Sequence, residues 1–100
     1  MLTSKQRAQL RALASTADTI IHVGKGGVSD AVAAQTLEAL HARELVKGRV
    51  LENSLLTARE ACEALAEACE AEPVQAIGSK FVLYKENVQL DKDKRIKLVK

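Results

Sequence analysis

The stretch Val23-Gly24-Lys25-Gly26-Gly27-Val28-Ser29-Asp30 joins a short apolar run to an amphipathic segment through a turn with three glycines and one lysine. The run before it, residues 19–23, is rich in β-branched residues, which favour strands. After it, apolar side chains recur three and four positions apart, and Ser29 can cap a helix over about 30–42. The stretch therefore predicts a strand, a tight turn and a helix in direct succession.

The turn also has the chemistry of an anion-binding site. Glycines let another backbone approach closely, and the helix that follows directs free N–H groups and a partial positive charge at the turn. Lys25 adds a full positive charge. We therefore name Gly24, Lys25, Gly26 and Gly27 as candidate phosphate-binding residues, with a plain strand-to-helix connector as the alternative.

Two capping boxes mark the starts of two further helices. Thr3 with Gln6 opens the first, which ends in a loop over 15–18. Thr57 with Glu60 opens the second, which runs to about residue 70. One helix therefore precedes the first strand, and the other follows the second strand.

The remaining apolar segments predict strands. One strand spans 45–51, and residues 74–77 and 81–84 predict a β-hairpin around Gly78-Ser79-Lys80. The element order is then α-β-α-β-α-β-β. We expect a single compact α/β domain with a four-stranded mixed sheet, three strands parallel and one antiparallel. A chain of 100 residues with 47% hydrophobic content can bury one such core.

This topology predicts a basic rim at one edge of the sheet. Parallel strands end at the same edge, so the glycine turn should lie beside 52–54 and the hairpin tip 78–80. The first helix should run back along the sheet and bring its N-terminal turn to the same edge. The candidate binding residues outside the glycine turn are therefore Lys5, Arg7, Arg11, Asn53 and Lys80.

Charge is distributed unevenly along the chain. The net charge is only +2, but residues 53–73 carry five acidic and one basic side chain, whereas 74–100 carry seven basic and three acidic ones. A basic rim around a glycine turn suits the phosphates of structured RNA. The aromatic residues, Phe81 and Tyr84, both fit a strand core, so a platform for base stacking is disfavoured.

Other locations and chemistries have weaker signals. The N-terminal residues lack the apolar segment of a secretory signal, and no apolar run approaches the ~20 residues of a membrane span, so we expect a cytoplasmic protein. Cys62 and Cys69 lie seven residues apart on one predicted helix, too far for a disulfide and without the partners of a metal site. His22 is interpreted as structural. We expect a monomer with no cofactor and no small-molecule substrate.

Three segments together resemble a known family. They are 23–29, the run 44–47 leading to 50–53, and 74–78 through 82–85. With the opening Leu2-Thr3-Ser4-Lys5-Gln6, they resemble the stand-alone YhbY type of the CRM (chloroplast RNA splicing and ribosome maturation) domain over residues 2–85. The sequence departs from that pattern at Gly48, where a branched apolar residue is usual, and at 70–73, which replace a glycine-containing helix exit.

The resemblance implies an α/β fold with a GxxG loop, here residues 24–27, analogous to the loop with which KH domains hold nucleic-acid backbone. It also implies RNA binding and association with precursors of the large ribosomal subunit in bacteria. Residues 1–85 are then the RNA-binding domain, and 86–100 a basic C-terminal tail. The tail is expected to be disordered unless 96–99 adds an edge strand.

Two other function classes compete with RNA binding. A phosphate-ester or nucleotide enzyme could use the glycine turn, but the turn lacks the GxxxxGK[ST] pattern, and no paired carboxylates or nucleophile–base set accompanies it. A protein-interaction module could dock through the acidic face of the third helix, around Glu63 and Glu67. The leading hypothesis is a non-enzymatic RNA-binding module in ribosome assembly, and docking through the acidic helix is the alternative.

Overall fold

The three helices begin where their capping residues predict. In the computed structural model, which describes residues 2–100, Thr3 and Thr57 each cap a helix through a complete capping box. The Ser29 hydroxyl caps the middle helix by accepting from the N–H of Val32. The elements are α1 (Ser4–Ala14), β1 (Thr19–Val23), α2 (Asp30–Arg43), β2 (Leu45–Val50), α3 (Ala58–Cys69), β3 (Glu72–Ile77) and β4 (Lys80–Tyr84). This is the predicted order.

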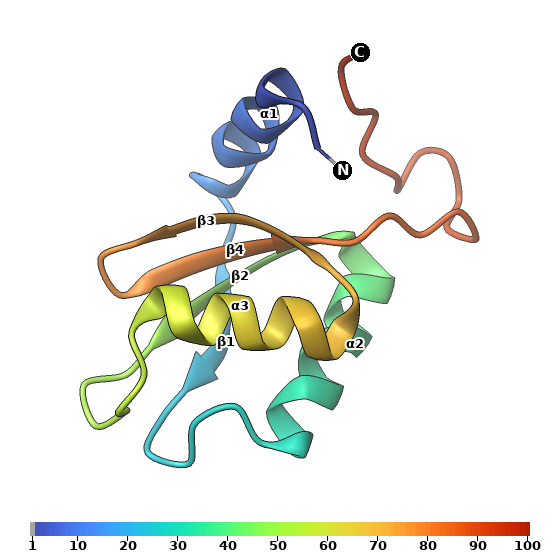
Figure 1. The fold of residues 1–100 in the computed structure, drawn as a ribbon. Helices are drawn as coiled ribbons and strands as arrows, with labels where there is room; N and C mark the ends of the chain where they lie inside the picture. The colour runs from blue at the N-terminus through green and yellow to red at the C-terminus, as the bar shows by residue number, and fades with distance from the viewer. Residues whose placement is uncertain (1) are drawn as a thin grey trace.

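The four strands form one mixed sheet in the order β1-β2-β4-β3 (Figure 1). β1, β2 and β3 run in one direction and β4 runs against them, which confirms the predicted arrangement of three strands and one. Because β4 lies between β2 and β3, β1 and β2 are the one parallel pair with direct hydrogen bonds in the described chain. The hairpin therefore joins the sheet through its second strand.

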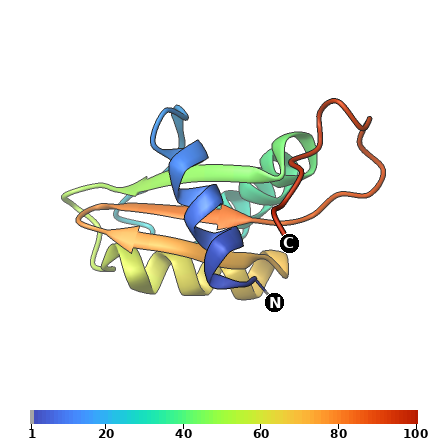
Figure 2. The ribbon, with the colours of Figure 1, turned by 90° about the horizontal axis from the view of Figure 1, so that it is seen from above.

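Helices cover both faces of this sheet (Figures 1 and 2). α2 and α3 pack on one face, over a core that includes Leu65 and Phe81. α1 crosses the other face, where Leu10 packs with Val82 and Tyr84. Successive residues of β4 therefore pack into two different cores, because the side chains of a strand alternate between its two faces.

The direction of α1 differs from the prediction. Instead of running back along the sheet, α1 crosses β3, β4 and β2 (Figure 2). Near its start, Arg7 donates to the carbonyl of Pro73, and at its end the carbonyl of Ala14 accepts from Lys47 Nζ at 3.1 Å. The buried side chains of α1 pack on apolar side chains of β3 and β4, which favours this crossing direction.

The C-terminal segment, residues 86–100, lies back against α1. Gln6 Nε2 donates to the carbonyl of Val99 at 2.9 Å, and Gln9 Oε1 accepts from the N–H of Val99 at 2.8 Å. The side chain of Ile96 joins the core beneath α1. The expected disordered tail is therefore wrong, and the edge strand considered for its last residues does not form either.

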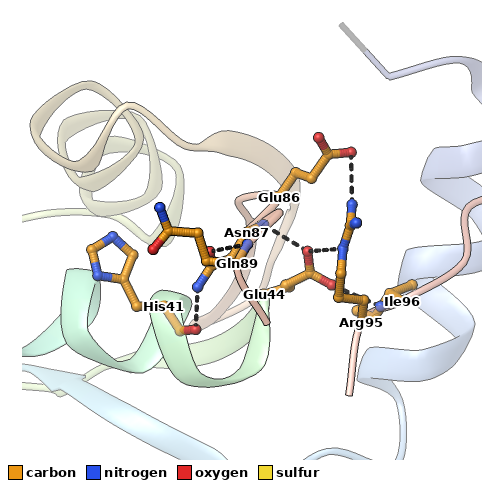
Figure 3. Close-up of polar contacts among 7 residues, drawn as sticks. All are labelled: His41, Glu44, Glu86, Asn87, Gln89, Arg95 and Ile96. Carbon is orange, nitrogen blue, oxygen red and sulfur yellow. Dashed lines mark hydrogen bonds and ion pairs between the residues drawn. The ribbon is translucent and has the colours of Figure 1, made fainter. Parts of the chain in front are cut away.

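A buried carboxylate fixes the start of this segment (Figure 3). Glu44 follows α2 with φ of +64°, and its side chain is fully buried. Oε2 accepts from the N–H of Asn87 and Oε1 from the N–H of Ile96, both at 2.7 Å. Arg95 Nε lies 3.8 Å from Oε2. A side chain at positive φ is costly, and here it brings two charge-assisted hydrogen bonds that glycine could not make.

Gly48 is explained by the close approach of Phe81. The two residues pair across β2 and β4, and a Cβ on Gly48 would lie 2.2 Å from Cζ of the fully buried Phe81 ring. The glycine at which the sequence departs from the CRM pattern thus makes room for the largest fully buried side chain.

We expect Gly48→Ala to lower the free energy of unfolding by about 1–3 kcal/mol, because the added methyl group overpacks the Phe81 ring. Urea denaturation followed by circular dichroism measures the loss. Phe81→Leu makes room at the same place, so the Gly48→Ala penalty should shrink in that background. An equal penalty in both backgrounds would show that the ring is not the obstacle.

We expect Glu44→Gln to release the C-terminal segment, because an amide cannot replace both oxygen acceptors. The free energy of local opening at this segment should fall by about 1.5–3 kcal/mol, the contribution of a hydrogen bond to a charged group. Hydrogen exchange at the Asn87 and Ile96 amides measures it, and both should exchange faster. Glu86→Gln, which alters an exposed carboxylate 3.6 Å from Arg95, is the matched control and should leave both amides protected.

Candidate nucleic-acid interface

Residues 24–27 form a hydrogen-bonded β-turn. The N–H of Gly27 donates to the carbonyl of Gly24 at 3.0 Å, and Gly27 has φ of +66°, a conformation that favours glycine. Lys25 and Gly26 occupy the two corners and are exposed. Neither corner N–H donates to any residue of 2–100. The turn therefore presents one ammonium group and two unused amide donors to solvent.

Neighbouring segments support this turn from below. The N–H of Leu51 donates to the carbonyl of Val23 at 2.8 Å, which extends the β1–β2 pairing up to the turn. A Cβ at Gly24 would lie 3.6 Å from Asn53 Oδ1, and one at Gly27 would lie 3.7 Å from Leu56 Cδ1. The structure thus places Asn53 directly beside the turn.

The hairpin tip lies at the same edge of the sheet. The carbonyl of Ser79 accepts from the N–H of Val50 at 2.7 Å, at the end of β2. An open pocket separates the tip from the loop before α3 and is lined in part by Thr57 and Ser79. We call this edge, made of residues 24–27, 51–56 and 78–80, the rim (Figure 1).

The predicted basic residues of α1 do not lie on the rim. Arg7 is bound to Pro73 at the start of β3, and the rim follows the end of that strand. Lys5 is exposed in the first turn of α1, and Arg11 is exposed on the same flank as Arg7, since residues four apart share a helix face. Their predicted gathering at the rim is therefore wrong, because α1 crosses the sheet.

Three exposed side chains near the rim are not among the residues predicted from the sequence. Arg49 and His22 pair across β2 and β1, and Leu55, in the loop before α3, is 94% exposed. Strand alternation indicates that Arg49 faces away from the core beneath α2 and α3, into which Gly48 and Phe81 face. The same alternation places His22 on the opposite face from Ile21 and Val23, whereas no comparable signal marks Leu55, which lies outside the strands.

The balance of charge on the rim is modest. The rim carries Lys25 and Lys80 against Glu52, and no carboxylate of residues 2–100 forms an ion pair with either lysine. The exposed acidic side chains of α3, Glu60, Glu63 and Glu67, belong to the helix that covers the opposite face of the sheet from α1. A polyanion is therefore favoured at the rim and on the α1 side of the molecule.

The cysteines are core residues. Cys62 and Cys69 are free and buried beneath α3. Burial raises the pKa of the Cys62 thiol to about 11 and raises the pKa of the Cys69 thiol as well. Both are protonated at neutral pH, so neither has the thiolate character of a nucleophile.

The described residues offer neither a metal site nor a membrane span. Within residues 2–100, no group of three or more His, Cys, Asp or Glu side chains is placed to hold a metal ion. The helices of the same residues are too short or too polar to cross a membrane.

Comparisons with known proteins agree on one family. The model of the CRS1 / YhbY (CRM) domain matches residues 2–85. The Bacillus subtilis (strain 168) protein named "Probable RNA-binding protein YqeI" is 46% identical over 87 residues, which are 87% of this chain and 91% of that protein. A Haemophilus influenzae protein named "RNA-binding protein" is 31% identical over 84 residues, 84% of this chain and 85% of that protein.

A solved structure is also similar over the full length. The solution structure of SAV1595 from Staphylococcus aureus matches with a TM-score of 0.80 and 41% sequence identity, covering 99% of this chain and 100% of that one. The match therefore includes the C-terminal segment as well as the region of the family model. On this sequence and structural evidence, the chain belongs to the CRS1/YhbY (CRM) domain family.

Proposed function

We propose that this chain binds structured RNA through the phosphate backbone, with residues 24–27 as the principal contact. The observation that carries the proposal is the turn itself, whose corners present Lys25 and two unused N–H donors. The turn precedes α2, whose N-terminus adds a partial positive charge. The names of two relatives, which describe RNA-binding proteins, support the same class of ligand.

The residues beside the turn extend this contact. Asn53 lies next to Gly24, so its amide can hydrogen-bond a phosphate or a base that approaches the turn. Lys80 follows the hairpin tip and adds a second positive charge to the rim. Arg7, Arg11 and Lys5 lie on α1, so an RNA that reaches them must pass from the rim over the sheet.

The proposed natural ligand is precursor RNA of the large ribosomal subunit, in an assembly role and without catalysis. The resemblance to the YhbY type of CRM domain supports this identity. In this proposal a single copy of the chain binds the RNA in the cytoplasm, without a cofactor. The acidic face of α3 would repel RNA, and it is the surface that a protein partner would use in the alternative function.

The two glycines that end the turn should respond differently to alanine. We expect Gly27→Ala to destabilise the fold by about 1–2 kcal/mol, the cost of an L-residue in the left-handed region. Gly26→Ala should change stability by less than about 0.5 kcal/mol, because a Cβ there meets nothing within 4 Å. Thermal melting of the two variants measures the difference, and equal losses would contradict the turn geometry.

The RNA-binding test changes Lys25 and Gly26, the two exposed corners of the turn. We expect Lys25→Asp/Gly26→Asp to lose at least tenfold in affinity for a 23S ribosomal RNA transcript, because two carboxylates then face the phosphates. Filter binding at two salt concentrations measures it, and the salt slope should fall by roughly 0.7–0.9 for each phosphate that the variant no longer binds. A 16S transcript, tested in parallel, should bind more weakly if the large subunit is the natural source.

The matched control is Gln89→Asp/Lys92→Asp, which makes the same change of charge at exposed positions of the C-terminal segment. It should retain most of the affinity. A folded turn variant that binds as well as the native chain would reduce the turn to a connector. A Glu63→Gln/Glu67→Gln variant should leave RNA binding unchanged.

A further inference from the structure

Three side chains form a row across the sheet, which begins on the rim at Lys80 and continues directly behind it. His22 of β1 pairs with Arg49 of β2, and Arg49 pairs with Lys80 of β4. All three are exposed on the face that α1 crosses, because Gly48 and Phe81, the adjacent residues in the two strands, meet in the core on the other face. We call His22, Arg49 and Lys80 the basic row.

α1 leaves this row open. Its last turn lies over Lys47, which reaches the carbonyl of Ala14, and Leu10 packs on Val82. Lys47 and Val82 are themselves a cross-strand pair, two residues farther from the rim than the basic row. Figure 2 shows the sheet continuing past α1 to the hairpin tip, with the C-terminal segment on the other side of the helix.

The central pair of the row is electrostatically unfavourable in the isolated chain. Arg49 and Lys80 stand directly opposite each other, and like charges at such positions destabilise a sheet. No carboxylate of residues 2–100 forms an ion pair with either side chain. An anion from outside the chain, bound beside the two side chains, would therefore relieve their repulsion.

We infer that the basic row is a second contact for the RNA backbone, continuous with the turn. The inference rests on the proposed function and extends it from the rim onto the open part of the sheet. His22 is separated from the turn only by Val23, and Lys80 follows the hairpin tip, so one strand of RNA can contact the turn and the row together.

The geometry of the row suits phosphates. Neighbouring strands lie about 4.8 Å apart, so the three side chains span roughly 10 Å across β1, β2 and β4. The Arg49 guanidinium can hold a phosphate with two N–H donors, and Lys80 adds a point charge. Ile77, which pairs with Lys80 and is 66% exposed, continues the row with apolar surface suited to a ribose.

The test compares Arg49→Gln/Lys80→Gln with the control Arg43→Gln/Lys92→Gln. Both variants remove one arginine and one lysine from exposed positions, but Arg43 ends α2 far from the turn and Lys92 lies in the C-terminal segment. Binding of each to the 23S transcript is measured at two salt concentrations, beside the native chain and the turn variant. Thermal melting checks that each variant folds.

The row variant should lose at least tenfold in affinity, and its salt slope should be shallower by roughly 1.4–1.8, as expected when two phosphates are no longer bound. Its melting temperature should equal or exceed that of the native chain, since the like-charge pair is gone. The control should bind within about twofold of the native chain.

The other outcomes separate the basic row from the turn. If the row variant binds like the native chain while the turn variant fails, the inference is overturned, Lys80 is removed from the proposed contact, and the turn stands as the principal contact. If the row variant and the control lose affinity equally, net charge alone is responsible and the inference is again overturned. If the row variant fails and the turn variant binds normally, the row stands and the turn is not the principal contact. If the native chain does not bind the transcript, both proposals are overturned.

Discussion

The packing of Phe81 on Gly48 is the contact on which both faces of the sheet depend. Because position 48 has no Cβ, the ring fills that space and fixes the register of β4 against β2. A slip of one residue would turn Phe81 out of its core and would turn Tyr84 away from α1. The same register sets Lys80 opposite Arg49, so a packing constraint in the core determines a charge pattern on the surface.

A second constraint divides the α1 side of the sheet into a covered part and an open part. The buried Glu44 carboxylate holds the backbone of the C-terminal segment at Asn87 and Ile96, and the segment then bonds to Gln6 and Gln9 on one flank of α1. The other flank, with Arg7 and Arg11, borders the open part that leads to the rim (Figure 2). The buried Glu44 carboxylate thus lies away from the proposed RNA surface.

The two faces of the sheet differ electrostatically. α3 carries exposed glutamates over one core, whereas the basic row and the α1 arginines lie on the other face. A polyanion approaching the turn is repelled from one side and attracted to the other. In the complex that we propose, RNA contacts the turn first and then extends over the basic row toward α1.

The local elements could be predicted because their causes are local. Capping boxes at Thr3 and Thr57, a cap at Ser29 and the glycine turn act over three or four residues, so sequence spacing alone determined the helix starts and the element order. The proximity of the turn to Asn53 also followed, because parallel strands end at one edge.

What only the tertiary structure decided involves residues far apart in the chain. The insertion of β4 between β2 and β3, the path of α1 and the binding of Ile96 by Glu44 each depend on which surfaces fit together, and no short spacing encodes that fit. The basic row belongs to this second class. Alternation places Arg49 on a face, but the partner opposite it is set by the Phe81 ring meeting a glycine across the sheet.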